Sequence, residues 1–559
     1  MQASAQSQLD TYGPQCDSIA ALAGIGSNGK HKHNCERDFQ RLQVADHELA
    51  IVPDPHYMDL VVRRKDKLGL ELRRHPILLP HDWFGCCHLA GPRVFSELMV
   101  GEQATLDRFW ELHEARPQAW QGMGRQDNGH SVPYAIYGDD AGVFEKSKVL
   151  FLMMHACLCD KETLQRSFLL TAVPYSSVAD GITLEEIYSE ITWSLQACER
   201  GVHPHLDASG QRLTGWRAEL SGKRLAGKWN LTFGWFEGDW KYTKETFHLQ
   251  SYAHEQCCHL CRCTKHGRFS YIDHRITAPW RTGGRVSHTE YVFRVEEAGY
   301  RVPFLDVPGF SHTLIAVDDM HANDQGFCLR ATGSIVVWLV RTGVFGHDVV
   351  NIKLQRVYHR YLRWCKRTGQ KTHCVQFTSD NLHLKGKFVF LTSKAADARH
   401  FANFCYDTLI ELQGRLQHLP DWGLVLSCSW SLRTYYEVEY SSGTFMDDEQ
   451  VNRMIEAVRT MTTSLVALHV LSDDKRLWKP KPKDHQLIHL VEDWTTNTRC
   501  NPRLSAKYKN ENFIRLMKRM SKSCDSRCMT SRLVEHFLLN AALVWAALAA
   551  GREVPDLNG

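Results

Sequence analysis

The sequence predicts an α/β fold in which a mixed β-sheet with flanking helices is interrupted by a large, mostly helical insertion. Four short apolar runs between residues 134 and 236 have the length and residue types of buried strands. An amphipathic helix separates the third run from the fourth. Residues 335–470 then show helical periodicity with little strand alternation, which predicts the insertion.

The four strands are expected at residues 134–137, 149–155, 168–173 and 229–236, and the helix at residues 184–198. The helix carries carboxylates in its first turn, as helix N-termini favour. The first strand runs into Asp139 and Asp140, and the fourth is followed by Asp239. A strand with an acid, two more strands, a helix and a fourth strand with an acid is the element order of a ribonuclease-H-like core.

Outside the strands, helices are expected at residues 93–114, 401–416, 447–470, 510–520 and 531–550, and the KPKPK run at 479–483 is expected to be a stiff basic connector. The chain divides into five regions. They are a flexible polar tail at 1–50, a mixed or helical N-terminal region at 51–125, the first part of the core at 126–330 with a Cys/His loop at 254–274, the helical insertion at 331–500, and C-terminal helices that complete the core at 501–559.

The composition excludes several classes of protein. The 559 residues carry a net charge of +4, with 43% hydrophobic and 23% charged residues, which excludes a mostly disordered chain, a collagen and a supercharged nucleic-acid packer. The 19 cysteines are spread over a long chain, unlike a disulfide scaffold. The first sixteen residues are polar, and the longest apolar stretch near the C-terminus, 541–550, is half the length of a membrane span. We therefore expect an intracellular protein without a membrane span.

Three acids have contexts that suit phosphodiester chemistry. Asp139 and Asp239 follow strands, and Glu511 begins a basic helix. Carboxylates held at strand ends can bind two Mg²⁺ ions about 3.5–4 Å apart, which activate a nucleophile and stabilise the leaving oxygen. Each acid also has an ordinary explanation, since aspartates are common in turns and a glutamate at a helix start interacts with the helix dipole.

A Cys/His cluster at residues 254–274 is a candidate for half of a zinc site. Cys258 and Cys261 form a CxxC pair, Cys263 lies two residues further on, and His266 or His274 could complete the ligand set. No matching second half is recognised downstream. The alternative is a cluster of reduced thiols that packs in a loop.

Two further features accompany the acids. Asp318 and His321 are three residues apart and would share a helix face. Residues 503–532 carry nine lysines and arginines against two acids, which suits a DNA backbone, although charge runs are more often solvated helix faces. The candidate DNA-binding residues are Arg503, Lys507, Lys509, Arg515, Lys518, Arg519 and Lys522.

Taken in order, these segments resemble those of CACTA (En/Spm) transposases, which belong to the DDE superfamily with a ribonuclease-H-like core. PYAIYGDDAG resembles the strand with the first acid, although Asp140 stands where a glycine is usual. FEGDWKYTKETFHL followed by CCHLCRCTK resembles the segment with the second acid. VDDMH resembles the family's Asp-x-Met-His element, and KPKPKDHQLIHL followed by YKNENF resembles the segment that precedes the third acid.

The resemblance implies a DNA transposase that cleaves transposon ends and transfers the strand to target DNA. Asp139, Asp239 and Glu511 would hold two Mg²⁺ or Mn²⁺ ions, with Asp140 as an alternative first acid, and His321 would lie near the scissile phosphate. Double-stranded DNA would be the partner, a homo-oligomer is left open, and DNA as substrate places the protein in the nucleus. Two alternatives remain, an inactive transposase-derived protein that binds DNA without cutting it and a zinc-stabilised interaction protein.

Overall fold

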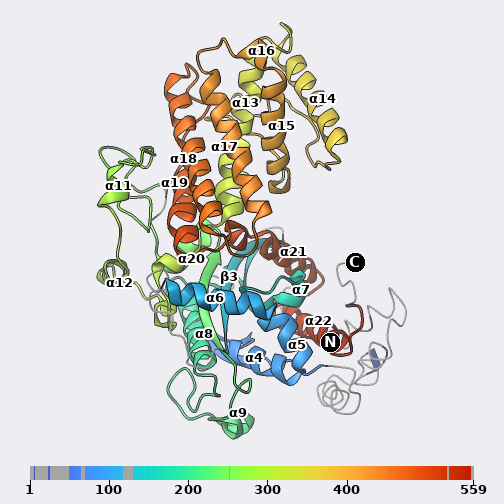
Figure 1. The fold of residues 1–559 in the computed structure, drawn as a ribbon. Coiled ribbons are helices and arrows are strands. Elements are labelled where there is room, and N and C mark those ends of the chain that lie inside the picture. The colour runs from blue at the N-terminus through green and yellow to red at the C-terminus, as the bar shows by residue number, and fades with distance from the viewer. Residues whose placement is uncertain are drawn as a thin grey trace.

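The computed structural model describes residues 50–64, 69–116, 130–144, 147–250, 252–525 and 528–554, with four single positions before residue 50. The fold is mixed α/β, with a mixed sheet and flanking helices, as predicted. Figure 1 shows two lobes, a lower lobe that contains the sheet and an upper lobe of long helices. The predicted tail at residues 1–50 lies almost wholly outside the described residues.

The central sheet contains four strands in the order β5-β4-β3-β6. Their bounds are Ser131–Phe144 for β3, Ser147–Ala156 for β4, Phe168–Pro174 for β5 and Asn230–Gly238 for β6. β4 runs antiparallel to both β3 and β5, whereas β6 runs parallel to β3. Each predicted strand is therefore present, and β3 continues well past its predicted end because its second half pairs with β4.

The N-terminal region contributes a two-stranded antiparallel hairpin that the sequence did not predict. β1 spans His56–Arg63 and β2 spans Leu70–Ile77. The first half of β2 is charged and exposed, so it lacks the apolar run by which a strand is recognised in a sequence. The predicted helix at residues 93–114 is divided, because Gly101 has a left-handed backbone (φ 70°) between the π-helical turn Ser96–Val100 and α6 (Gln103–Ala115).

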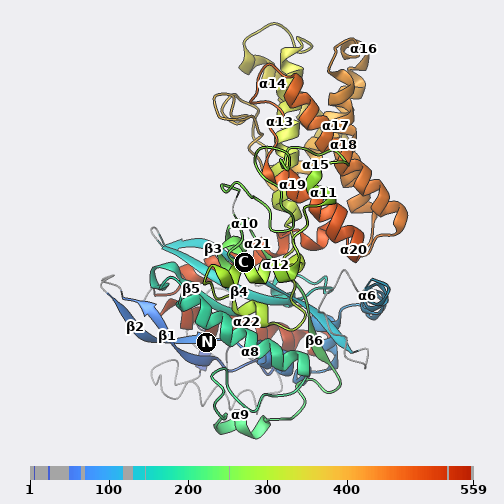
Figure 2. The same ribbon diagram turned by 90° about the vertical axis from the view of Figure 1, so that its left-hand side faces the viewer.

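Helices cover both faces of the central sheet. Figure 2 shows α8 (Thr183–Arg200) in front of the strands and the red C-terminal helices α21 (Tyr508–Lys522) and α22 (Met529–Ala549) behind them. α21 packs against β3, and α22 packs against β5. Buried aromatic rings fix this arrangement, since Trp83 of α4 (Pro80–Leu89) contacts both Phe168 and Trp545.

The upper lobe consists mainly of long helices that lie between the two parts of the sheet lobe in the sequence. They are α13 (Leu329–Arg341), α14 (Val350–Thr368), α15 (Ala398–Glu411), α16 (Gln413–Leu416), α17 (Trp422–Ser441) and α18 (Asp448–Leu471). The predicted helix at 447–470 matches α18, whose first turn is closed by a capping box between Asp447 and Gln450. The predicted helix at 401–416 is divided between α15 and α16.

The remaining elements are shorter. The α-helices among them are α5 (Pro92–Phe95), α7 (Thr163–Arg166), α9 (Gly215–Leu220), α10 (Trp240–Phe247), α11 (Pro279–Thr282), α12 (His288–Glu297), α19 (Pro482–His489) and α20 (Thr496–Thr498). π-helical turns cover Met320–Cys328 (η6) and Leu490–Thr495 (η8). The KPKPK run is a connector only in its first half, because Pro482 and Lys483 already belong to α19.

Two helices, α18 and α22, are long and apolar enough to cross a membrane by length and composition alone. In the fold, α18 packs against α17, and α22 packs against β5 and α21. The core helix of a soluble protein passes the same test of length and hydropathy, so these helices are weak support for a membrane span. The absence of a span remains a prediction.

Candidate functional site

Asp139 and Asp239 are brought together by the parallel pairing of β3 and β6. Gly138 of β3 is the register partner of Gly238 of β6, so the aspartate that follows each glycine lies at the same level of the sheet. Asp239 is also the N-cap of α10, where its Oδ1 accepts a hydrogen bond of 2.6 Å from the amide of Tyr242. Asp239 therefore caps α10 and also belongs to the candidate site.

The two glycines are required by a close approach of the Tyr242 ring. A Cβ at residue 138 would lie 2.1 Å from Cζ of Tyr242, and a Cβ at residue 238 would lie 2.6 Å from its Cδ1. Because the ring is rigid and buried, either side chain would push the two strands and α10 apart. Packing against Tyr242 thus explains the glycine that precedes each aspartate, and Asp139 lies inside β3, paired with Phe151 of β4, and not at the end of a strand as predicted.

The structure distinguishes Asp139 from Asp140. Lys148 and Lys241 each lie 2.6 Å from a carboxylate oxygen of Asp140, and these two ammonium groups outweigh partial burial and hold its pKa below the usual value. Asp139 Oδ1 accepts the Asp140 amide at 2.6 Å, and its Oδ2 accepts the Tyr137 hydroxyl at 3.0 Å. Asp140 is therefore neutralised by lysines, and Asp139 is the residue that faces the other acids.

Glu511 joins Asp139 and Asp239 from the first turn of α21, which packs against β3. Burial, together with the nearby carboxylates of Asp239 and Glu511, raises the pKa of Asp139 to about 7. Burial also raises the pKa of Glu511, with Asp318 and Asp239 adding to the increase and His321 opposing it. The three predicted acids thus interact electrostatically across elements that are up to 372 residues apart in sequence.

A buried glutamate fixes α21 relative to the sheet. Glu237 lies two residues before Asp239 on β6, and its Oε2 accepts a hydrogen bond of 2.5 Å from Asn510, the residue before Glu511. Lys507 Nζ lies 3.0 Å from Oε1 of Glu237, and His155 Nε2 lies 3.1 Å from Oε2. Although burial opposes ionisation, Lys507 and His155 hold the pKa of Glu237 well below its usual value. This cluster attaches the strand of the second acid to the helix of the third.

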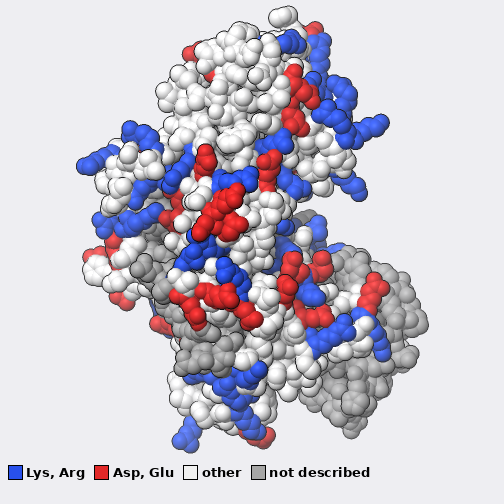
Figure 3. Space-filling model, viewed as in Figure 1, with Lys and Arg blue, Asp and Glu red and all other residues white. Residues whose placement is uncertain are grey.

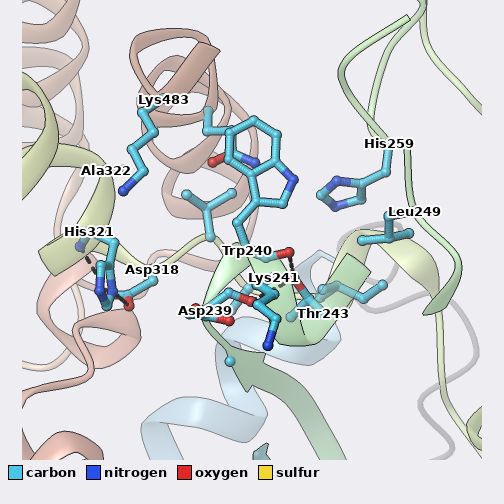
Figure 4. Close-up of a pocket in the computed structure, with 15 residues that line it drawn as sticks. Asp239, Trp240, Lys241, Thr243, Leu249, His259, Asp318, His321, Ala322 and Lys483 are labelled. Carbon is cyan, nitrogen blue, oxygen red and sulfur yellow. Dashed lines mark hydrogen bonds and ion pairs between the residues drawn. The ribbon is translucent and has the colours of Figure 1, made fainter. Parts of the chain in front are cut away.

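A pocket of about 110 Å³ opens beside Asp239, between β6, η6 and α19. Figure 4 shows Asp239, Asp318, His321 and Lys483 on one side of it and His259 on the other. His321 Nδ1 lies 2.5 Å from Asp318 Oδ2, and this ion pair raises the pKa of His321 in spite of the opposing effect of burial. Among the described residues, Lys483 has no ion pair, so its ammonium group is available to a ligand of the pocket.

The Cys/His cluster is a compact candidate metal centre. Ligand atoms of Cys258, Cys261, Cys263 and His485 all lie within 4.8 Å of one another, and all four residues are buried. Burial would raise the pKa of Cys261, but Cys263 and His485 lower it to about 7. Three thiolates and an imidazole are a usual ligand set for structural Zn²⁺, and the amide of Leu260 already donates to Cys258 Sγ at 3.3 Å. The residues therefore fit zinc.

The fourth ligand predicted from sequence is wrong. His266 is exposed, and His274 lies against Thr462 of α18, whereas His485 comes from α19, more than two hundred residues away. His489, one turn later, lies 3.3 Å from Cys261 Sγ and 3.0 Å from His485 Nε2, and Asp493 Oδ2 contacts its Nδ1 at 2.5 Å. The downstream ligand that was not recognised in the sequence is thus His485, and His489, which contacts Asp493, lies beside it.

The candidate DNA-binding residues have different environments. Arg503, Arg515, Arg519 and Lys522 are exposed, and Lys518 is half-buried on α21. Lys509 pairs with Asp160. The prediction for Lys507 is wrong, because its side chain is 1% exposed and its ammonium group is bound to Glu237. A charge run in the sequence could not show which lysine turns inward.

A second basic surface, on α14, was not predicted from the sequence. α14 carries Lys353, Arg356, Arg360, Arg363, Lys366 and Arg367 and no acid. One face of the helix, with Leu354, Tyr361 and Trp364, is buried, so most of the cations lie on the opposite face. Figure 3 shows basic side chains gathered along the right-hand edge of the upper lobe, where α14 lies. Counting charge along residues 350–368 would have identified this helix.

Neither the protein-family models nor the curated proteins contain a match to this chain. The assignment of a function therefore rests on the geometry of the carboxylate pocket, the Cys/His cluster and the basic surfaces.

Proposed function

We propose that this protein is a metal-dependent DNA-cleaving and strand-transferring enzyme of the DDE transposase type, built on a ribonuclease-H-like core. The single observation that carries the proposal is that Asp239, which follows β6, and Glu511 of α21 are both close enough to Asp139 of β3 to contribute to the rise in its pKa. The order β5-β4-β3-β6, with only β6 parallel to β3, supports the core assignment. The sequence resemblance to CACTA transposases supports the same reaction class.

The carboxylate cluster fits divalent cations. Its hard oxygen donors suit Mg²⁺ or Mn²⁺, and a bound cation would offset the burial and the neighbouring carboxylates that raise the pKa of Asp139. When bound, such ions would activate a water or 3′-hydroxyl nucleophile and stabilise the leaving oxygen. Asp139, Asp239 and Glu511 would supply the ligands, and the Glu237 cluster would hold Glu511 in place.

The other residues of the pocket would act on the DNA phosphate. His321, whose positive charge is favoured by Asp318, and Lys483 present cationic groups to the space beside Asp239. Non-bridging phosphate oxygens accept hydrogen bonds from such groups. The zinc-binding residues would position this wall, because Lys483 lies two residues before His485 on α19 and His259 follows Cys258.

Nicking of supercoiled plasmid DNA in Mn²⁺ tests the proposal. Asp239→Asn should lower the nicking rate at least about a hundredfold, since cation binding at such a site is worth several kcal/mol to the transition state. Asp140→Asn is the matched control, because its carboxylate is bound by two lysines, and it should retain most of the activity. Equal nicking by Asp239→Asn and the parent, or an equal loss in Asp140→Asn, would contradict the assignment.

A further inference from the structure

A second cavity, of about 330 Å³, lies where the end of α17 meets the first turn of α21. Residues 157–160, 439–444 and 501–510 form most of its wall, and it shares no lining residue with the pocket beside Asp239. The volume is in the range of pockets that bind small molecules. The cavity is therefore separate from the pocket beside Asp239. α21 borders the cavity and also carries Glu511.

Two arginines stack on Tyr440, a residue of the cavity wall, and of the two Arg503 lines the cavity. Cζ of Arg399 lies 3.9 Å from the centre of the Tyr440 ring, and Cζ of Arg503 lies 4.7 Å from it. In the part of the chain that the structure describes, neither guanidinium group forms an ion pair with a carboxylate. The guanidinium group of Arg503 can therefore bind an anion in the cavity.

The acids of the wall do not neutralise these arginines. Burial and the neighbouring Asp319 and Asp324 raise the pKa of Glu439 well above its usual value, although Arg503 opposes this shift. Glu237 is already paired with Lys507 and His155.

Additional positive groups face the same space. Lys509 lines the cavity beside its partner Asp160, and Arg166 lines it with a buried Nε that has no hydrogen-bond partner. Tyr508, Lys509 and Asn510 belong to the first turn of α21, where the helix dipole favours an anion. The cavity thus combines a helix N-terminus with guanidinium groups that lack acidic partners.

We propose that this cavity binds a phosphate group of a nucleotide, with Arg503, held on the Tyr440 ring, and Arg166 as its main ligands. The phosphate source that we favour is a DNA strand, and this choice rests on the proposed function. Asn510 lines the cavity, while the next residue, Glu511, interacts with the catalytic carboxylates, so one strand could reach both sites across α21. A free nucleotide carries the same chemistry.

Isothermal titration of the full-length, zinc-loaded chain without Mg²⁺ or Mn²⁺ tests the site, with ATP and a 5′-phosphorylated trinucleotide as separate probes. The double variant Arg166→Gln/Arg503→Gln should weaken binding of the active probe at least about tenfold, since charge-assisted hydrogen bonds to phosphate are lost. Arg212→Gln, an exposed arginine before α9, is the control and should bind as the parent does. Arg503→Lys keeps the charge and should show an intermediate loss.

The outcomes separate the two phosphate sources and the two proposals. Binding of the trinucleotide alone supports a DNA strand, and binding of ATP alone supports a free nucleotide. The site is overturned if neither probe binds the parent below 1 mM, on the order of −4 kcal/mol, or if the double variant binds equally well. A parent that nicks plasmid DNA in Mn²⁺ but binds neither probe keeps the proposed function and loses only this site.

Discussion

The Cys/His cluster and the carboxylate pocket lie next to each other but differ in how their ligands are held. The ligand atoms of Cys258, Cys261, Cys263 and His485 are buried within 4.8 Å of one another, so the fold presents a closed set of donors. Asp239 lines an open pocket, and its carboxylate adds to the effect of burial in raising the pKa of the neighbouring Asp139. A closed set of donors is typical of a structural metal, and an open one leaves room for a substrate.

The difference indicates a division of roles between the two sites. α19 connects them, because it carries His485 in the cluster and Lys483 in the pocket. A metal held rigidly in the first site would fix one wall of the second, where the chemistry is proposed. The following predictions test that division, from the largest expected effect to the smallest.

Loss of a ligand of the Cys/His cluster should have the largest effect on folding stability. Cys261→Ser should abolish stoichiometric zinc in elemental analysis and lower the melting temperature by several degrees or more, because structural zinc contributes about 10–16 kcal/mol in small zinc domains. His266→Ala is the matched control and should leave both quantities unchanged, since His266 is exposed. A Cys261→Ser protein with full zinc content and an unchanged melting temperature would contradict the assignment of the Cys/His cluster as a structural metal site.

Glu237 should matter next, as the residue that positions Glu511. Glu237→Gln leaves the buried Lys507 without its carboxylate, which should cost about 3–5 kcal/mol of folding stability. It should also raise the Mn²⁺ concentration needed for half-maximal nicking, which a purely structural loss would not change. Glu245→Gln, on the exposed face of α10, is the control. The double variant Glu237→Gln/Lys507→Met should recover melting temperature without recovering the Mn²⁺ requirement; recovery of both would contradict the positioning role.

The pH dependence of the carboxylate pocket should be the third effect. The pKa of Asp139 is raised from 3.8 to about 7 by burial and its acidic neighbours, so its protonated form is favoured by the fold. Without metal, ionising this group costs stability progressively between pH 4 and pH 7, by up to about 4 kcal/mol, and the cost is constant above that range.

The measurement is the melting temperature of the metal-free pocket from pH 5 to pH 8, compared with that of Asp139→Asn. The parent should lose stability relative to the variant as pH rises, and added Mn²⁺ should stabilise the parent most above pH 7, where Asp139 is ionised. Parallel curves for the two proteins, with an equal Mn²⁺ effect, would show that Asp139 does not interact with the other acids.

The smallest effect is expected from substitutions on the basic face of α14. They test whether bound DNA extends beyond the pocket beside Asp239. Lys353, Arg363 and Lys366 have no ion pair among the described residues. Changing all three to glutamine should reduce the slope of log affinity against log salt by about 2–3 for duplex DNA. Zinc content and melting temperature should not change. A slope equal to that of the parent would restrict DNA contact to the sheet lobe.

The local parts of the fold were readable from the sequence. The four strands and α8 were predicted because short, almost uninterrupted apolar runs and a helical apolar stripe are local signals. The hairpin of β1 and β2 was missed because only part of it is buried. Asp139, Asp239 and Glu511 were identified by their positions at element ends and by the family resemblance.

The long-range parts of the site were not readable. His485 contacts Cys261 only because α19 packs against the loop at residues 254–274. The spacing of residues within either segment does not predict that contact. Lys507 has the same composition signal as its exposed neighbours, yet the buried Glu237 draws it inward. Asp139 and Asp140 differ in partners that only the strand pairing reveals.

Anomalous diffraction from crystals of the full chain soaked in Mn²⁺, recorded at the zinc and manganese edges, tests the central claim most directly. The account predicts a zinc peak among Cys258, Cys261 and His485 and at least one manganese peak bound by Asp139, Asp239 and Glu511 together. Manganese bound away from these three carboxylates, or bound by Asp140 in place of Asp139, would contradict it.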